Sequence, residues 1–153
     1  MIRNIGKLFL TLCLLMVGGG VVANAQVDAV PQKIEVNIPF AFAVGDTKLP
    51  AGRYEIRIPE PVSPNVLEIR DARGHTSVVF NTESAEKTQD EIANKTELIF
   101  DKIADQYFLS QIWVAGSTSG NELPKSRMEK RLSNGGNQPE KHSVVAFMRH
   151  LKP

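Results

Sequence analysis

From residue 33 onward, apolar and polar side chains alternate in short runs, and this period of two constrains the fold more than any other feature. The clearest run is KIEVNIPFAF, residues 33–42, in which Glu35 and Asn37 stand between apolar residues of one parity. Alternation of this kind indicates a β-strand with one buried face. Pro39 cannot donate a hydrogen bond to a neighbouring strand, so we expect the strand to bend there or to lie at a sheet edge. Its apolar positions are Ile34, Val36, Ile38, Phe40 and Phe42.

Six further segments have the composition of strands, and turn signals separate them. In RYEIRI the side chains of Tyr54, Ile56 and Ile58 are expected to point inward, because they share one parity. Asp71–Gly74 and Ala104–Asp105 are expected to close two β-hairpins. The six segments are residues 53–58, 66–70, 75–81, 96–103, 106–115 and 143–150.

The segment 82–95 is polar and without periodicity, so it is expected to be an exposed loop, with at most a short helical turn. The count is then about seven strands against one helix, with turns at hairpin spacing. We therefore predict an all-β chain, folded as a single-domain β-sandwich or a small closed barrel.

The strand YFLSQIWV has apolar side chains on both parities, which indicates that both of its faces are covered. A short helix, from Ser126 to about Ser133, is the expected cover. Ser126 and Glu129 have the spacing of a capping box, and the Asn-Gly-Gly that follows Ser133 would end the helix.

Met128 and Leu132 lie four residues apart, so they form a narrow apolar stripe on this helix. With Leu123, this stripe is expected to pack near Ile112 or Trp113. Structural roles are therefore expected for Trp113 in packing, for Gly116 and Gly120 in turning the chain back, and for Met128, Glu129 and Leu132 in the helix.

The N-terminus has the pattern of a signal peptide. Arg3 and Lys7 precede an apolar run, which ends in small residues and Ala23-Asn24-Ala25. The uninterrupted apolar part is shorter than the about 20 residues needed to cross a bilayer. We expect cleavage after Ala25, export to the periplasm or beyond, and a domain of residues 26–153 that is not an integral membrane protein.

Cleavage would remove Cys13, which is the only cysteine, so the exported chain would have no disulfide, no thiolate metal site and no cysteine nucleophile. The first 25 residues carry two of the 18 basic residues and none of the 17 acidic ones, so the exported chain would have a net charge of −1. This balance gives no general attraction to nucleic acid.

Two blocks of sequence resemble an uncharacterised family of short exported bacterial proteins. They are IPFAFAVGDTKLPAGRYEI near the start of the exported chain and YFLSQIWVAGSTSGNELPKSRMEKRL near its end. The resemblance implies export and a β-rich domain, and it implies no activity and no catalytic residues.

No motif for a cofactor or a metal ion is recognised. His75, His142 and His150 lack the spacing of metal ligands. Ser84 and Lys87 match the Ser-x-x-Lys pattern of penicillin-recognising enzymes, but the companion motifs are missing. We predict no catalytic residue, no metal and no cofactor.

The basic residues at the start of the expected helix are the candidate ligand site. Cations beside the free N–H groups of a helix N-terminus can bind phosphate or carboxylate, while a solvated helix face would have the same composition. The candidate residues are Lys125, Ser126, Arg127, Lys130 and Arg131.

Three functional hypotheses follow. The first is a non-catalytic extracytoplasmic protein of the cell envelope, which binds an envelope component or a protein partner or has a structural role. The second is a small extracytoplasmic hydrolase that uses the carboxylates of Asp105 and Glu122, with Tyr107 and Arg127 in the same cleft. The third is a β-barrel associated with the outer membrane, although Arg53 and Glu55 suit a water-facing wall.

Overall fold

The computed structural model describes residues 32–58, 65–88, 91 and 94–150. The expected signal peptide, with Cys13 and the cleavage site after Ala25, lies outside these residues. Eleven strands and one helix are described. They are β1 (Gln32–Ile38), β2 (Phe42–Val44), β3 (Thr47–Leu49), β4 (Gly52–Arg57), β5 (Val66–Asp71), β6 (Ser77–Asn81), β7 (Glu83–Glu86), β8 (Glu97–Ile103), β9 (Gln106–Trp113), β10 (Ser119–Glu122), α1 (Arg127–Asn134) and β11 (Glu140–His150). The expected fold class, all-β with one short helix, is confirmed.

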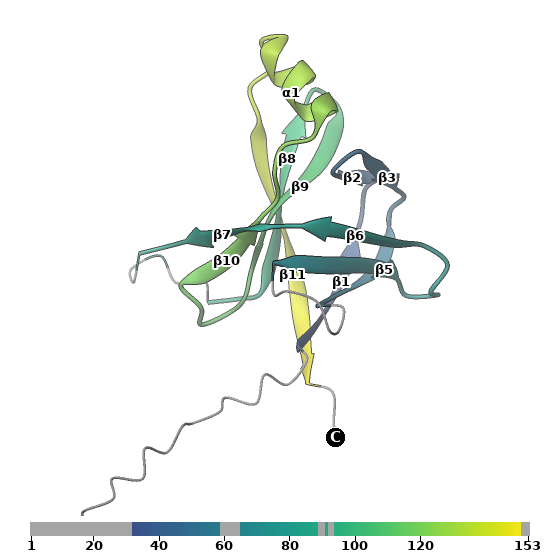
Figure 1. Cartoon of the computed structure of the whole chain (residues 1–153), viewed down its shortest axis with the longest axis vertical. Helices are drawn as coiled ribbons and strands as arrows, with labels where there is room; N and C mark the ends of the chain where they lie inside the picture. The colour runs from purple at the N-terminus through teal and green to yellow at the C-terminus, as the bar shows by residue number, and fades with distance from the viewer. Residues whose placement is uncertain (1–31, 59–64, 89–90, 92–93, 151–153) are drawn as a thin grey trace, which may run out of the picture.

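The strands form one sheet that curls into a barrel (Figure 1). Antiparallel pairs run in the order β6-β5-β4-β1-β11-β8-β9, and β9 then pairs with β10, which pairs with β7. β6 and β7 lie end to end and are separated by a single residue, Thr82. The ring of strand pairs is therefore complete, since one continuous strand pairs first with β5 and then with β10. The short β2–β3 hairpin lies outside this ring, where β2 pairs in parallel with the start of β9.

Thr82 is the residue at which the ring closes. Its backbone N–H donates to the carbonyl of Asn65 at 2.8 Å, and its hydroxyl donates to the same carbonyl at 3.2 Å. The side-chain amide of Asn121 on β10 donates to the Thr82 hydroxyl oxygen at 3.0 Å. Thr82 is 5% exposed, so these hydrogen bonds connect the β5 side and the β10 side of the wall away from water.

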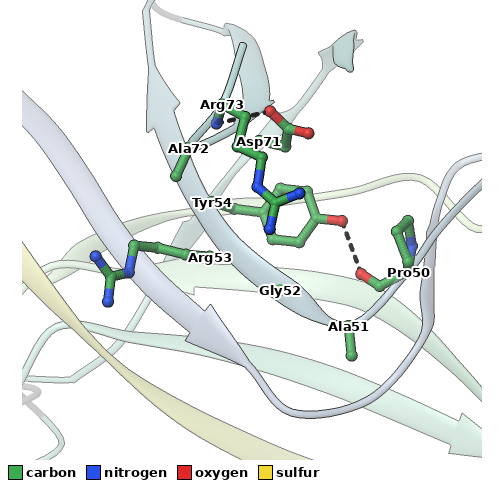
Figure 2. A pocket seen from close by; sticks show the side chains of 8 residues that line it. All are labelled: Pro50, Ala51, Gly52, Arg53, Tyr54, Asp71, Ala72 and Arg73. Atoms are coloured by element: carbon green, nitrogen blue, oxygen red, sulfur yellow. Dashed lines mark hydrogen bonds between the residues drawn. The ribbon is translucent and has the colours of Figure 1, made fainter. Parts of the chain in front are cut away.

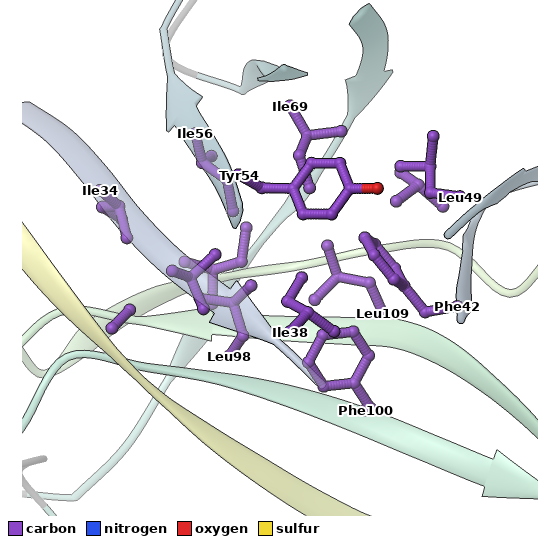
Figure 3. Packing of buried hydrophobic residues seen from close by; sticks show 14 of the residues in the cluster. Ile34, Ile38, Phe42, Leu49, Tyr54, Ile56, Ile69, Leu98, Phe100 and Leu109 are labelled. Atoms are coloured by element: carbon purple, nitrogen blue, oxygen red, sulfur yellow. The ribbon is translucent and has the colours of Figure 1, made fainter. Parts of the chain in front are cut away.

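The interior of the barrel is filled by apolar side chains (Figure 3). Aromatic rings meet edge to face near its centre, with Phe42 about 5.2 Å from Tyr54 and 5.5 Å from Phe100 between ring centroids. This arrangement suits the charge distribution of aromatic rings. The buried cluster consists of Ile34, Val36, Ile38, Phe42, Val44, Leu49, Tyr54, Ile56, Leu67, Ile69, Leu98, Phe100, Leu109, Ile112, Leu123 and Ala146.

A β-bulge explains why β9 is apolar on both faces. Ile99 on β8 pairs with Gln111 and the next residue pairs with Leu109, so Ser110 is an extra residue in β9. The bulge reverses the alternation, and Leu109 and Ile112 both lie in the barrel interior. Phe108 lies on the outside, in a second buried cluster.

The helix α1 covers this outer face, as expected, but at a different place. Met128 and Leu132 pack against Ala43, Ile103 and Phe108 and not near Ile112 or Trp113. The expected position was wrong because the helix lies over the start of β9 near Phe108, whereas Ile112 faces the interior and Trp113 lies at the other end of the strand. Leu123, which was expected to join the stripe, belongs to the barrel interior instead.

Two further expectations were wrong. Ile58 follows the end of β4 and is 43% exposed instead of inward. The segment 82–95 was expected to be a loop, but it contains Thr82 and the strand β7. Hydrogen bonds to β10 make this strand, and its side chains are largely exposed, so the hydrophobic pattern carried no sign of it.

Trp113 and Gly120 form a cross-strand pair on the outside of the barrel. A Cβ atom at Gly120 would lie 2.6 Å from the indole ring, so only glycine leaves room for it. Gly120 thus lies within β10 and not in a turn, whereas Gly116 has a positive φ of 78° in the turn before β10. The Lys87 ammonium lies 4.1 Å from the ring centroid, and Trp113 is 2% exposed.

We expect Thr82→Val to destabilise the fold by about 1–2 kcal/mol, because the half-buried amide of Asn121 would lose its acceptor while the shape of the Thr82 side chain is kept. The free energy of unfolding in urea measures the effect. Thr47→Val, at an exposed position of β3, is the matched control and should change it little. Equal effects of both substitutions would contradict the role assigned to Thr82.

We expect Gly120→Ala to destabilise the fold by about 1–3 kcal/mol, because the new methyl group would overlap the indole ring. Urea unfolding followed by circular dichroism measures this, because Trp113 is the only tryptophan and variants that replace it have no indole fluorescence. Gly52→Ala is the control, since its Cβ would meet Tyr54 at 3.6 Å, an ordinary contact. Combining Gly120→Ala with Trp113→Leu should cost less than the sum of the two single changes.

Candidate functional site

The basic residues at the start of α1 surround a helix end that the chain caps itself. Ser126 is the N-cap, and its hydroxyl accepts the N–H of Glu129 at 3.1 Å. The Glu129 carboxylate accepts the N–H of Ser126 at 3.3 Å, which completes the expected capping box. The carboxylate of Glu129 therefore already occupies the end of the helix that attracts anions. The four basic residues, Lys125, Arg127, Lys130 and Arg131, are exposed.

Beneath α1 lie two buried carboxyl groups, those of Asp101 on β8 and Glu129. Asp101 pairs with Lys141 on β11 at 2.5 Å and accepts a hydrogen bond from Ser110 at 3.3 Å. Burial raises the pKa of Glu129, against the effect of its hydrogen bond from Ser126, and the nearby charge of Asp101 raises it further. Asp101 therefore joins β8, β9 and β11 within the wall, and Glu129 caps its own helix. Met128 and Leu132 supply the apolar packing of α1 against the wall.

The residues of the hydrolase hypothesis are only partly brought together. Asp105 and Tyr107 line a small hollow of about 130 Å³ with Lys48. Glu122 on β10 pairs with Gln111 on β9, and Gln111 lies six residues after Asp105 in the chain. At ~3.3 Å per residue this is roughly 20 Å along β9, which exceeds the ~10 Å within which paired catalytic carboxylates act on a glycosidic bond.

The outer face of β11, β1 and β4 carries a chain of ion pairs. Arg149 contacts Glu35 at 3.0 Å, and Lys33 contacts Glu35 at 3.3 Å and Glu55 at 2.5 Å. The hydrogen bond to Glu55 is the main cause of the raised pKa of Lys33. The register places Lys33 opposite Arg149 and Glu35 opposite Glu55, so each cross-strand ion pair joins diagonal neighbours.

A second ion-pair group, on β4, β5 and β6, is centred on Glu68. Arg57 contacts its carboxylate at 2.7 Å and Arg70 contacts it at 3.0 Å. The Ser77 hydroxyl donates to it as well. Glu68 is 6% exposed, and the hydrogen bond from Ser77, with those from Arg57 and Arg70, outweighs burial and lowers its pKa to about 2.

Arg53 is the cation of this face that has no partner among the described residues, and it lies between two surface hollows. The larger, of about 400 Å³, is shown in Figure 2. Tyr54 closes its floor and donates a hydrogen bond to the Pro50 carbonyl at 2.7 Å, and Arg73 also lines the hollow. The side chain of Arg53 points away from this hollow toward the neighbouring strand.

The second hollow at Arg53, of about 270 Å³, lies over β11, β1 and β4. Its lining includes Glu35, Asn37, Arg53, Phe147 and Arg149. Phe147 is 71% exposed, although it is one of the largest apolar residues of the chain. Sequence reasoning did not select Asn37, Arg53 or Phe147. The segment SVVAFMRH contained a sign of Phe147, because Val145 and Phe147 have the parity opposite to that of the buried Ala146 and so point to the outer face.

Comparisons of the chain with protein families, curated proteins and solved structures found no match. In the described ranges, no group of three or more His, Cys, Asp or Glu side chains is placed to hold a metal ion. The helix within these ranges is not long and apolar enough to cross a membrane.

We expect the stability of the protein to fall as the pH is lowered from about 4.5 toward 2, in part through Glu68. Its pKa is about 2 in the folded protein against an ordinary value of 4.5, so protons bind the unfolded chain first in this range. Glu68→Gln should weaken this pH dependence. Urea unfolding at a series of pH values measures it, with Glu83→Gln, exposed on β7, as the control. An unchanged slope in Glu68→Gln would contradict the assignment.

Proposed function

We propose that this chain is a non-catalytic extracytoplasmic protein of the bacterial cell envelope, which binds an envelope component or a protein partner. The observation that carries the proposal is the filled interior of the barrel. Sixteen buried apolar residues occupy the space in which a hollow barrel would hold a ligand. A binding role therefore belongs to the outer surface, where the hollows at Arg53 lie.

The polar groups that are buried in the described residues support the same proposal. Asp101 joins three strands of the wall, Ser126 and Glu129 cap α1, and Glu68 joins three further strands. Each of these residues has a partner among the described residues and a structural role, although the Oε1 atom of Glu129 has no hydrogen-bond partner there. The hydrolase hypothesis has less support, because Asp105 and Glu122 lie far apart along β9.

The extracytoplasmic part of the proposal depends on the N-terminal pattern. Arg3 and Lys7, the apolar run and Ala23-Asn24-Ala25 have the order of charge, apolar core and small residues that export requires. Loss of Cys13 with this segment suits a domain that is stabilised by its core, since no disulfide would be available to it.

The experiment is expression of the full chain in a bacterial host, followed by fractionation and mass spectrometry. We expect the protein outside the cytoplasm, with Gln26 as its first residue. We also expect no turnover of polysaccharide, peptide or ester substrates. Retention of residues 1–25 in a cytoplasmic product would contradict export. Multiple turnover that is abolished by Asp105→Asn or Glu122→Gln would establish the hydrolase instead.

A further inference from the structure

Of the large apolar side chains in the described residues, Phe147 is the most exposed, at 71%, and polar side chains surround it. Register puts Phe147 on β11 directly opposite Glu35 on β1. Asn37 lies two residues further along β1, on the same face, and pairs with Arg53 on β4. Cross-strand and diagonal neighbours of this kind are within reach of long side chains. Phe147, Asn37 and Arg53 therefore share one side of the 270 Å³ hollow.

The charges around this hollow are unbalanced. Three cations line or border it, Lys33, Arg53 and Arg149, against two anions, Glu35 and Glu55. Lys33 and Arg149 are already held by these glutamates. The guanidinium of Arg53 makes no ion pair or hydrogen bond within the described ranges, and the Asn37 amide makes none there either. The hollow thus offers one positive charge and one amide to a ligand.

The aromatic ring limits the kind of ligand further. An aromatic or aliphatic ligand gains most when both of its faces are removed from water. This hollow is shallow, and Phe147 provides a single apolar surface. A sugar ring suits such a surface, because one face of C–H groups can stack on the phenyl ring while its hydroxyl groups stay in water or reach Asn37. The planar guanidinium of Arg53 is matched to a carboxylate, which it can bind through two parallel hydrogen bonds.

We propose that the hollow formed by Phe147, Asn37 and Arg53 binds a saccharide that carries a carboxylate, such as a hexuronic acid unit of an acidic polymer. Phe147 stacks on the ring, Arg53 pairs with the carboxylate and Asn37 hydrogen-bonds to a hydroxyl. The size of the hollow suits one ring, since it is slightly below the range of about 300–1,000 Å³ that is typical of sites for drug-sized ligands. This inference rests on the proposed function and names the ligand class for it.

The test is calorimetric titration of the processed protein, recovered after expression of the full chain, with tetragalacturonate and with the carboxyl-reduced form of the same oligomer. We expect the acidic oligomer to bind at least about tenfold more tightly at low salt, because only this ligand carries the charge that Arg53 recognises. Equal affinities, or no binding of either oligomer, would overturn the proposal.

Two substitutions at Phe147 test whether binding requires an aromatic ring or only an apolar side chain at this position of the strand. Phe147→Ile replaces the ring with a β-branched apolar side chain that suits a strand, and it should weaken binding at least about fivefold, because stacking requires an aromatic face. Phe147→Tyr keeps that face and should bind within about twofold of the unchanged protein. The position is exposed, so we expect both variants to fold. Equal binding by Phe147→Ile and Phe147→Tyr would overturn the stacking role.

Arg53→Gln should bring the affinity for tetragalacturonate down to that for the carboxyl-reduced oligomer. Arg73→Gln is the matched control, since Arg73 is an exposed arginine that lines the other hollow and should not affect binding.

Binding to anionic lipid vesicles that is lost in Phe147→Ile, without saccharide binding, would assign the surface to a membrane and overturn the proposal. Cleavage of the oligomer during titration would instead contradict the non-catalytic function and leave the binding site in place.

Discussion

The closure of the barrel at Thr82 is the constraint on which the rest of the structure depends. β6 and β7 are one strand with two different neighbours, and Thr82 is where the change of neighbour occurs. An open sheet would present two unpaired edges, which are sites for pairing with other chains. The described residues contain no cysteine and therefore no disulfide that could resist opening, so hydrogen bonds at this junction and the packing inside the ring are what keep it closed.

Closure has a direct consequence for function. Because the ring is small, apolar side chains fill it, and only its outer wall can meet a partner. Most of that wall is accounted for by ion pairs across β11, β1, β4 and β5 and by the helix α1. Phe147 is the most exposed large apolar side chain in the described part of the wall, and the guanidinium of Arg53 has no ion pair there. The proposed site is the hollow that both residues line.

The alternation of apolar residues predicted β1, β4, β5, β6, β8, β9 and β11, turn residues predicted the hairpins at Asp71–Gly74 and Ala104–Asp105, and a capping box predicted the helix. Alternation did not predict β7 or β10. It failed where pairing does not depend on side-chain burial. β7 is a strand because β10 pairs with it, and its own side chains gave no pattern. The bulge at Ser110 was equally hidden, because one extra residue reverses the parity without changing composition.

The candidate site was harder to predict than the fold. The sequence indicated the basic start of the helix, where Glu129 already supplies the negative charge. It did not indicate Phe147. Apolar residues at both parities predict that both faces of a strand are covered, and β9 and β11 both have this pattern. The outer face of β9 is covered by α1, whereas Phe147 on the outer face of β11 is exposed. Whether a later segment covers a strand depends on the three-dimensional path of the chain, as does the absence of a partner for Arg53.

The most direct test of this account is hydrogen exchange at the backbone amides that close the ring. The N–H of Thr82 donates to Asn65, and the N–H of Leu123 donates to Ser110. If the ring is closed, both amides should exchange as slowly as that of Leu98 in the middle of β8, with free energies of opening close to that of global unfolding. Rapid exchange at Thr82 and Leu123 while Leu98 stays protected would show an open seam and contradict the account.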